Sequence, residues 1–161
     1  VRGEMENAVK DTKWNSVSSA LRQSRQLLRL LLEGDAIAVA KGVETAHSES
    51  TSILSYNNEN SMACVLTIAF YAARADYILN REMPTGKGFA DLVLMPRKNV
   101  AKPAIIIELK KNSTAEAAIA QIKERDYGQA VRLYTGDIVI VGINYDTKKK
   151  THTCLIERWN R

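Results

Sequence analysis

The part of the sequence that most constrains the fold is the stretch from residue 86 to residue 110. It reads as two apolar β-strands joined by a polar turn rich in Lys and Arg. Each strand contains an acidic residue, Asp91 in the first and Glu108 in the second. If the strands are neighbours in a sheet, both carboxylates lie close together, and Lys110 shares a face with Glu108 because strand side chains alternate. The stretch therefore predicts two acids and one base at one place in a sheet.

The surroundings of Glu108 suggest why an acid stands in an apolar strand. A carboxylate that loses its water needs a cation or several hydrogen-bond donors in exchange. Mg²⁺ or Mn²⁺ would suit, because these ions take one or two carboxylates and keep positions for water and phosphate oxygens. An ammonium beside such a site can orient or deprotonate an attacking water. The residues that flank Glu108 are all apolar: Ile105, Ile106, Ile107 and Leu109.

Two alternatives without chemistry stay open at this point. A Glu-x-Lys triplet arises easily by chance in a charged chain, so Glu108 and Lys110 could form an exposed ion pair. The acids could also pair with Lys110 and Arg125 in an ordinary globular domain. Absence of Mg²⁺ and Mn²⁺ binding would support these alternatives.

Hydrophobic spacing predicts two helices ahead of this stretch, one from Asn15 or Ser16 to a stop at Gly34 and one capped by Asp35. We expect them to form a helical extension over residues 15–54 that lies outside the sheet core, after a tag or disordered linker at residues 1–14.

A third helix, beginning at Asn57 or Asn58, opens an α/β domain over residues 55–161. A further helix follows residue 114, and its Gln121 either points toward the acids or lies on a solvated face. The strands are expected at residues 77–83, 89–95, 104–110, 137–144 and 151–158.

Charge and rare residues narrow the class of function. The net charge of +5 and pI near 9.2 favour polyanion partners. The run 148–150 is three lysines, and it reads more readily as a solvated turn than as a binding site. Cys64 and Cys154 show no disulfide or metal spacing, which is typical of reduced cysteines in a cytosolic protein. His47 and His152 have no partner pattern, so a zinc site or Ser-His-Asp triad is poorly supported.

The order of elements and the acids together resemble the PD-(D/E)xK nuclease superfamily. Its restriction-endonuclease-like core is αβββαβ around a mixed sheet, and the resemblance covers roughly residues 55–158. More closely, the chain resembles the nuclease-like C-terminal domain of bacterial predicted AAA-type ATPases. The matching motifs are a YNE-like segment, a G-x-x-D strand, an I-I-E-x-K strand and a Q-I-x-x-x-x-Y helix. Ala90 departs from the name-giving motif, which has Pro before the Asp.

The resemblance implies a role for each matching residue. Asp91, Glu108 and the backbone carbonyl of Leu109 would hold Mg²⁺ or Mn²⁺, and Glu59 would support the metal directly or through water. These roles are carried over from the family, position by position.

Lys110 would position the attacking water, and Gln121 would complete the catalytic set from the crossover helix. The function implied is a metal-dependent nuclease, acting on DNA in the first place and on RNA as the alternative. A second reading is an inactive module that binds nucleic acid or protein and regulates an attached ATPase domain. The oligomeric state stays open, although nucleases that cut both strands often act as homodimers.

Overall fold

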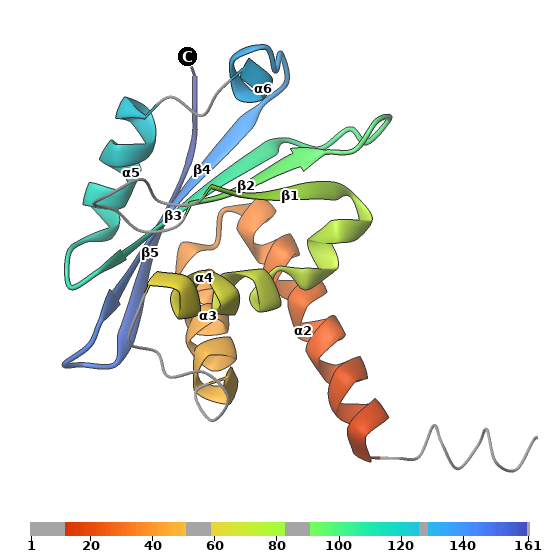
Figure 1. Ribbon diagram of the computed structural model, residues 1–161, viewed down its shortest axis with the longest axis vertical. Helices are drawn as coiled ribbons and strands as arrows, with labels where there is room; N and C mark the ends of the chain where they lie inside the picture. The colour runs from red at the N-terminus through yellow and green to blue at the C-terminus, as the bar shows by residue number, and fades with distance from the viewer. Residues whose placement is uncertain (1–11, 51–58, 83–90, 126–128, 161) are drawn as a thin grey trace, which may run out of the picture.

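A computed structural model of the protein describes residues 12–50, 59–82, 91–125 and 129–160 (Figure 1). A five-stranded mixed sheet runs in the order β1-β2-β3-β4-β5. Its strands are β1 (Tyr77–Glu82), β2 (Asp91–Pro96), β3 (Ala104–Lys111), β4 (Ile138–Asp146) and β5 (Thr151–Arg158). The helices are α2 (Thr12–Glu33), α3 (Ala36–Ser50), α4 (Glu59–Ala69), the 3-10 helix η1 (Tyr71–Ala75), α5 (Ala115–Glu124) and α6 (Gln129–Arg132).

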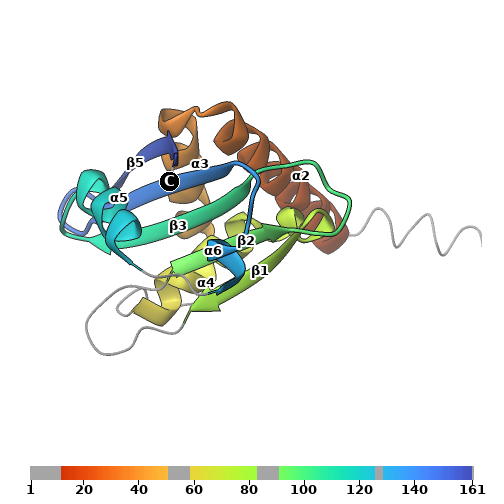
Figure 2. The ribbon, with the colours of Figure 1, turned by 90° about the horizontal axis from the view of Figure 1, so that it is seen from above.

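The strand directions confirm the predicted αβββαβ order and mixed sheet. Strands β1, β2 and β3 pair antiparallel, β3 and β4 pair parallel, and β5 returns antiparallel to β4. Seen from above, β3 and β4 run side by side, and α5 lies beside their carboxyl ends (Figure 2). The predicted turn between β1 and β2 falls at residues 83–90, outside the described residues.

One face of the sheet carries the larger apolar core. The odd-numbered residues of β3 and β4 pack there with α4 and with both N-terminal helices. The expectation that those two helices lie outside the sheet core is therefore wrong. The predicted linker at residues 1–14 is also too long, because α2 begins at Thr12. The buried apolar residues that α2 and α3 contribute to this core are Leu27, Leu28, Leu31, Val39 and Val43.

The turn between α2 and α3 is built as the sequence predicts. Gly34 has a φ of 82°, and its N–H bonds the carbonyl of Leu31 while the N–H of Asp35 bonds that of Leu30. Asp35 then caps α3 by accepting a hydrogen bond from the Ala38 N–H at 3.1 Å. This sharp connection turns both helices onto the same face of the sheet.

The other face carries a smaller core under α5 and α6. Thr114 caps α5 by accepting from the Ala117 N–H at 3.0 Å. Gly142 in β4 allows α5 to approach closely, because a Cβ there would lie 2.4 Å from the Ala115 carbonyl oxygen. The buried side chains of this core are Val93, Ala104, Ile106, Ile119, Ile122, Val131, Ile138 and Ile140.

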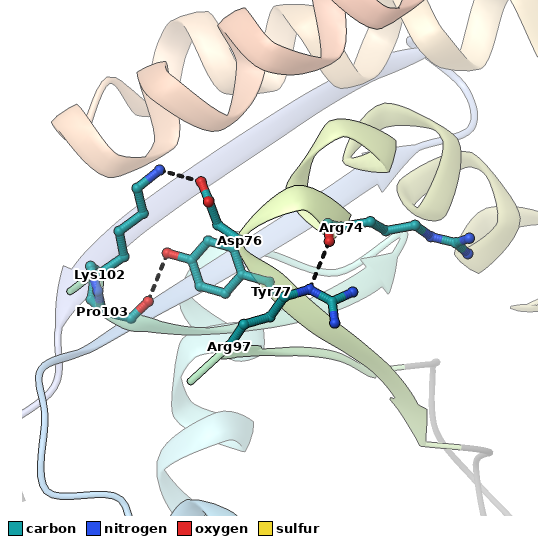
Figure 3. A network of polar contacts seen from close by, with 6 residues as sticks. All are labelled: Arg74, Asp76, Tyr77, Arg97, Lys102 and Pro103. Atoms are coloured by element: carbon teal, nitrogen blue, oxygen red, sulfur yellow. Dashed lines mark hydrogen bonds and ion pairs between the residues drawn. The ribbon is translucent and has the colours of Figure 1, made fainter. Parts of the chain in front are cut away.

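A polar network ties the start of β1 to the connection before β3 (Figure 3). The Tyr77 hydroxyl donates to the Pro103 carbonyl at 2.8 Å, and Lys102 pairs with Asp76 at 2.5 Å. The Arg97 N–H also bonds the Asp76 carbonyl at 2.8 Å. The network therefore fixes the register of the first three strands from the end of the sheet that lies away from Asp91.

Candidate active site

The strand register places the two predicted acids opposite each other. Asp91, the first residue of β2, is the direct partner of Glu108 in β3. Directly opposed residues of antiparallel strands share a face, with their Cβ atoms about 4.5–5.5 Å apart. Lys110 lies two residues further along β3, and therefore on that face as well. This is the face covered by α5.

Glu108 is the unusual residue of this site. Its side chain is 0% exposed, and neither carboxylate oxygen accepts a hydrogen bond from any residue that the structure describes. Lys110 Nζ lies 3.7 Å from Oε1, and Arg125 Nη1 lies 3.8 Å from Oε2. A buried carboxylate in this state has lost its water and is compensated only by charge at a distance. Its two oxygens have the chemistry to bind a hard divalent cation.

Helix α5 contributes two polar groups to the same place. Lys110 donates a hydrogen bond to Gln121 Oε1, so its ammonium lies between Gln121 and Glu108. Gln121 is on the last turn of α5, and Arg125 is the residue that ends this helix. The N–H of Arg125 bonds the Gln121 carbonyl at 3.1 Å. The crossover helix therefore brings an amide and a guanidinium to the acid of β3.

Comparison with known proteins assigns the chain to a family. A family model described as the PD-(D/E)XK nuclease superfamily matches residues 57–154. The chain belongs to the PD-(D/E)XK nuclease superfamily. No curated protein and no solved structure matches the chain. Nuclease chemistry is the general activity of this superfamily, and divalent metals such as Mg²⁺ are its typical cofactors.

The superfamily match covers only part of the structure that forms the larger apolar core. It includes α4, all of β1 to β4 and the first half of β5, whereas α2 and α3 precede it. Both N-terminal helices nevertheless pack in the same core as the matched strands. In the part of the chain that the structure describes, no helix is long and apolar enough to cross a membrane.

Two predicted site residues are not brought to Glu108 by what the structure describes. Glu59 is the first residue of α4, a helix that packs on the opposite face of the sheet through Met62 and Leu66. The Leu109 side chain also packs into that opposite core. The metal roles given to Glu59 and to the Leu109 carbonyl therefore stay predictions.

Two further residues of the site were not identified from the sequence. Glu82 ends β1 as the direct partner of Asp91, so acidic residues occupy three neighbouring positions of one row across the sheet. Asn144 in β4 is the partner of Lys110, and its Oδ1 accepts from the Ser113 N–H at 2.9 Å. Asn144 thereby fixes the turn that leads into α5. The alternation of the strands would have found Glu82 only if the register of the hairpin were known.

The two histidines show no partner pattern in the sequence, but they lie beside each other in the structure. His47 and His152 are buried, with ring centroids 5.3 Å apart, and Tyr145 lies 4.8 Å from His47 and 4.7 Å from His152. Burial and the charge of His47 lower the pKa of His152 to about 4, against the opposing effect of Glu44. The pKa of His47 is also lowered, mainly by burial. These rings lie on the face of the sheet that α3 covers, and Glu108 lies on the other face.

The histidines do not form a metal centre with other described side chains. Among the side chains that the structure describes, which do not include those of Glu59 and Asp91, no three His, Cys, Asp or Glu residues cluster to hold a metal. Cys64 and Cys154 are free thiols, and burial raises the pKa of Cys154 to about 12. The acids of β2 and β3 therefore remain the candidate for metal binding.

Proposed function

We propose that this protein is a divalent-metal-dependent nuclease that hydrolyses phosphodiester bonds in nucleic acid, with DNA as the first expected substrate. The observation that carries the proposal is the fully buried carboxylate of Glu108, which accepts no hydrogen bond from the described residues and lies directly across from Asp91. Membership of the nuclease superfamily supports the same chemistry.

The residues present fit a metal of the Mg²⁺ class. Asp91 and Glu108 would hold it, with the Leu109 carbonyl and Glu59 as the further expected ligands. When bound, such an ion would polarise the scissile phosphate and favour an attacking hydroxide near neutral pH. Mg²⁺ or Mn²⁺ would take its remaining ligands from water and from phosphate oxygens.

Lys110 and Gln121 have the task of ordering the attacking water. The ammonium lies 3.7 Å from Glu108 and is held by the amide oxygen of Gln121, so its direction is fixed before substrate arrives. A positive charge held there also stabilises negative charge that develops on the phosphate oxygens during attack. Arg125 lies on the other side of Glu108 and adds a second fixed cation.

The test is a cleavage panel of single-stranded, duplex and branched DNA and of RNA, with Mg²⁺, Mn²⁺ or EDTA. We expect cleavage of at least one substrate with metal and none with EDTA. Glu108→Gln keeps the shape of the side chain and removes its charge, and it should lower the rate by about a thousandfold or more, since several kcal/mol of charge stabilisation are lost.

Glu157→Gln is the matched control for that variant. Glu157 pairs with Lys123 at 2.7 Å on the surface, where loss of an ion pair has little effect. Circular dichroism shows whether each variant is folded. Unchanged cleavage by Glu108→Gln would refute the proposal, whereas metal-independent binding without turnover in the unmodified protein would identify a nuclease fold used only for binding.

A further inference from the structure

The turn between β4 and β5 presents three consecutive lysines at the end of the sheet. Lys148, Lys149 and Lys150 are all exposed, and they form no ion pair with an acid among the residues that the structure describes. The β4–β5 hairpin extends the sheet at the end where β3 also runs out toward α5 (Figure 1). This is the end at which Lys110 and Asn144 are paired.

The backbone of this turn is held in place by two side chains. Asp146 Oδ1 accepts hydrogen bonds at 2.9 Å from the N–H groups of Lys148 and Lys149. Asn112 Oδ1 accepts from both the N–H and the hydroxyl of Thr147, also at 2.9 Å. Asn112 follows β3, so the turn is fastened to the strand that carries Glu108. Bonds like those of Asp146 are common in turns, whereas the bonds of Asn112 tie this turn to the end of β3.

The register gives the distance from the turn to the proposed site. Gly142 is the partner of Glu108, and β4 continues from there to Asp146. At a rise of about 3.3 Å per residue, the turn begins about 13 Å along the strand from Glu108. A duplex that runs along β4 would advance about 3.4 Å per nucleotide, so the lysines would lie about four phosphates from a bond held at Glu108.

We propose that the turn of Lys148, Lys149 and Lys150 binds the phosphate backbone of the nucleic-acid substrate a few nucleotides from the bond that is cut. This inference rests on the proposed function. Lysine ammonium groups bind phosphates as point charges without reading bases, so the contact orients the substrate and adds affinity independently of sequence. The backbone hydrogen bonds lower the pKa of Asp146, so this carboxylate stays charged, but three lysines against one aspartate leave the turn with a net positive charge.

The experiment compares two triple variants with the same net charge. In one, Lys148, Lys149 and Lys150 are replaced by Gln. In the other, Gln replaces Arg22, Arg25 and Arg29, three exposed residues of α2. Dissociation constants for fluorescent single-stranded and duplex DNA and for RNA are measured by anisotropy in EDTA, which prevents cleavage, over a series of salt concentrations.

We expect the turn variant to bind about 10- to 100-fold more weakly near 0.1 M salt. The slope of log affinity against log salt should become shallower by about two to three, since each lost contact to a duplex phosphate removes about 0.9. The α2 variant should stay within about threefold of the unmodified protein. Thermal unfolding of both variants shows whether the fold is kept.

Equal losses in the two variants would overturn the inference, because net charge alone would then explain them. An unchanged affinity and salt slope in the turn variant would overturn it as well. If the unmodified protein cleaves and Glu108→Gln does not, either result removes only the role of the turn. If the unmodified protein binds no nucleic acid in EDTA, this inference fails, whereas the proposed nuclease function is decided separately by the cleavage panel with Mg²⁺ or Mn²⁺.

Discussion

The two faces of β3 present very different environments, although they belong to the same eight residues. On one face, Ile105, Ile107 and Leu109 are at most 2% exposed and pack under three helices. On the other face, the apolar pattern ends after Ile106, and Glu108 follows as a buried charge. The large apolar core on the first face holds the strand in place, and this allows the second face to keep a group that is unfavourable for folding.

Buried ionisable groups on the two faces also respond differently to burial. On the helix α3 side, His152 loses its tendency to be charged, because burial lowers its pKa to about 4. On the α5 side, Glu108 has two cations within 4 Å of its oxygens, Lys110 at 3.7 Å and Arg125 at 3.8 Å. Burial therefore favours the neutral form of His152, whereas Glu108 is buried between two cationic side chains. Carboxylate oxygens such as those of Glu108 suit hard divalent cations of the Mg²⁺ class, whereas neutral imidazoles suit softer metals.

The largest expected effect tests whether stability and chemistry are divided between the faces. Ile107→Ala should lower the free energy of unfolding by about 2–5 kcal/mol, because a fully buried side chain is truncated and leaves a cavity. The cleavage rate per folded molecule should stay within about threefold of the unmodified protein. Urea denaturation and cleavage assays on the same preparations measure both quantities. A large loss of cleavage rate in fully folded Ile107→Ala protein would show that stability and chemistry are not separated between the two faces.

The next effect concerns acid and the histidine face. Between a pKa of about 4 in the folded state and 6.5 in the unfolded state, the unfolded chain binds more protons at His152. The free energy of unfolding should therefore fall as the pH falls from 6.5 to 4, by roughly 3 kcal/mol over the whole window. Denaturation curves at several pH values measure this slope.

His152→Phe is the variant that sharpens this prediction. It keeps an aromatic ring beside Tyr145 and His47 and removes the titrating group of residue 152, so the slope between pH 4.5 and 6.5 should become shallower. Some slope should remain, since the pKa of His47 is also lowered by burial. An identical slope in the variant would show that the acid response arises elsewhere in the molecule.

The smallest effect concerns the charge balance at Glu108. Arg125→Gln removes one of the two cations that compete with a metal for this carboxylate. We expect Mn²⁺ affinity without nucleic acid to rise about three- to tenfold, a modest gain because Arg125 is partly exposed and solvent screens its charge. Isothermal titration calorimetry measures the affinity.

Arg158→Gln is the control, since Arg158 pairs with Asp137 at 3.4 Å on the exposed surface. Its Mn²⁺ affinity should match that of the unmodified protein. A reduced or unchanged Mn²⁺ affinity in Arg125→Gln would mean that Arg125 does not compete with the metal for Glu108. Lys110 would then be the one competing cation among the described residues.

The sequence was sufficient for the elements of the fold because their signals are local. Gly34 and Asp35 mark the turn between two helices, and continuous apolar runs mark β3 and β4. The packing of α2 was not predicted, because an apolar stripe shows that a helix needs a partner without showing which one. In the same way, the pairing of His47 with His152 depends on α3 crossing β5, which no local pattern encodes.

In the candidate site, too, the sequence predicted the relations that are local to one strand and missed those that depend on tertiary packing. The alternation of β3 placed Glu108 and Lys110 on one face, and that relation is local to the strand. The position of Glu82 beside Asp91 depends on the hairpin register, which a count along the chain could not provide. The closeness of Arg125 to Glu108 likewise depends on how near α5 stands to the sheet.

That nearness is decided by a residue with no functional group. Position 142 carries only a hydrogen where every other residue type would carry carbon, and the carbonyl of Ala115 occupies the space. A methyl group there would lift the crossover helix and carry the amide of Gln121 and the guanidinium of Arg125 away from the acid. The proposed site would then lose two of its polar groups although neither residue had been replaced.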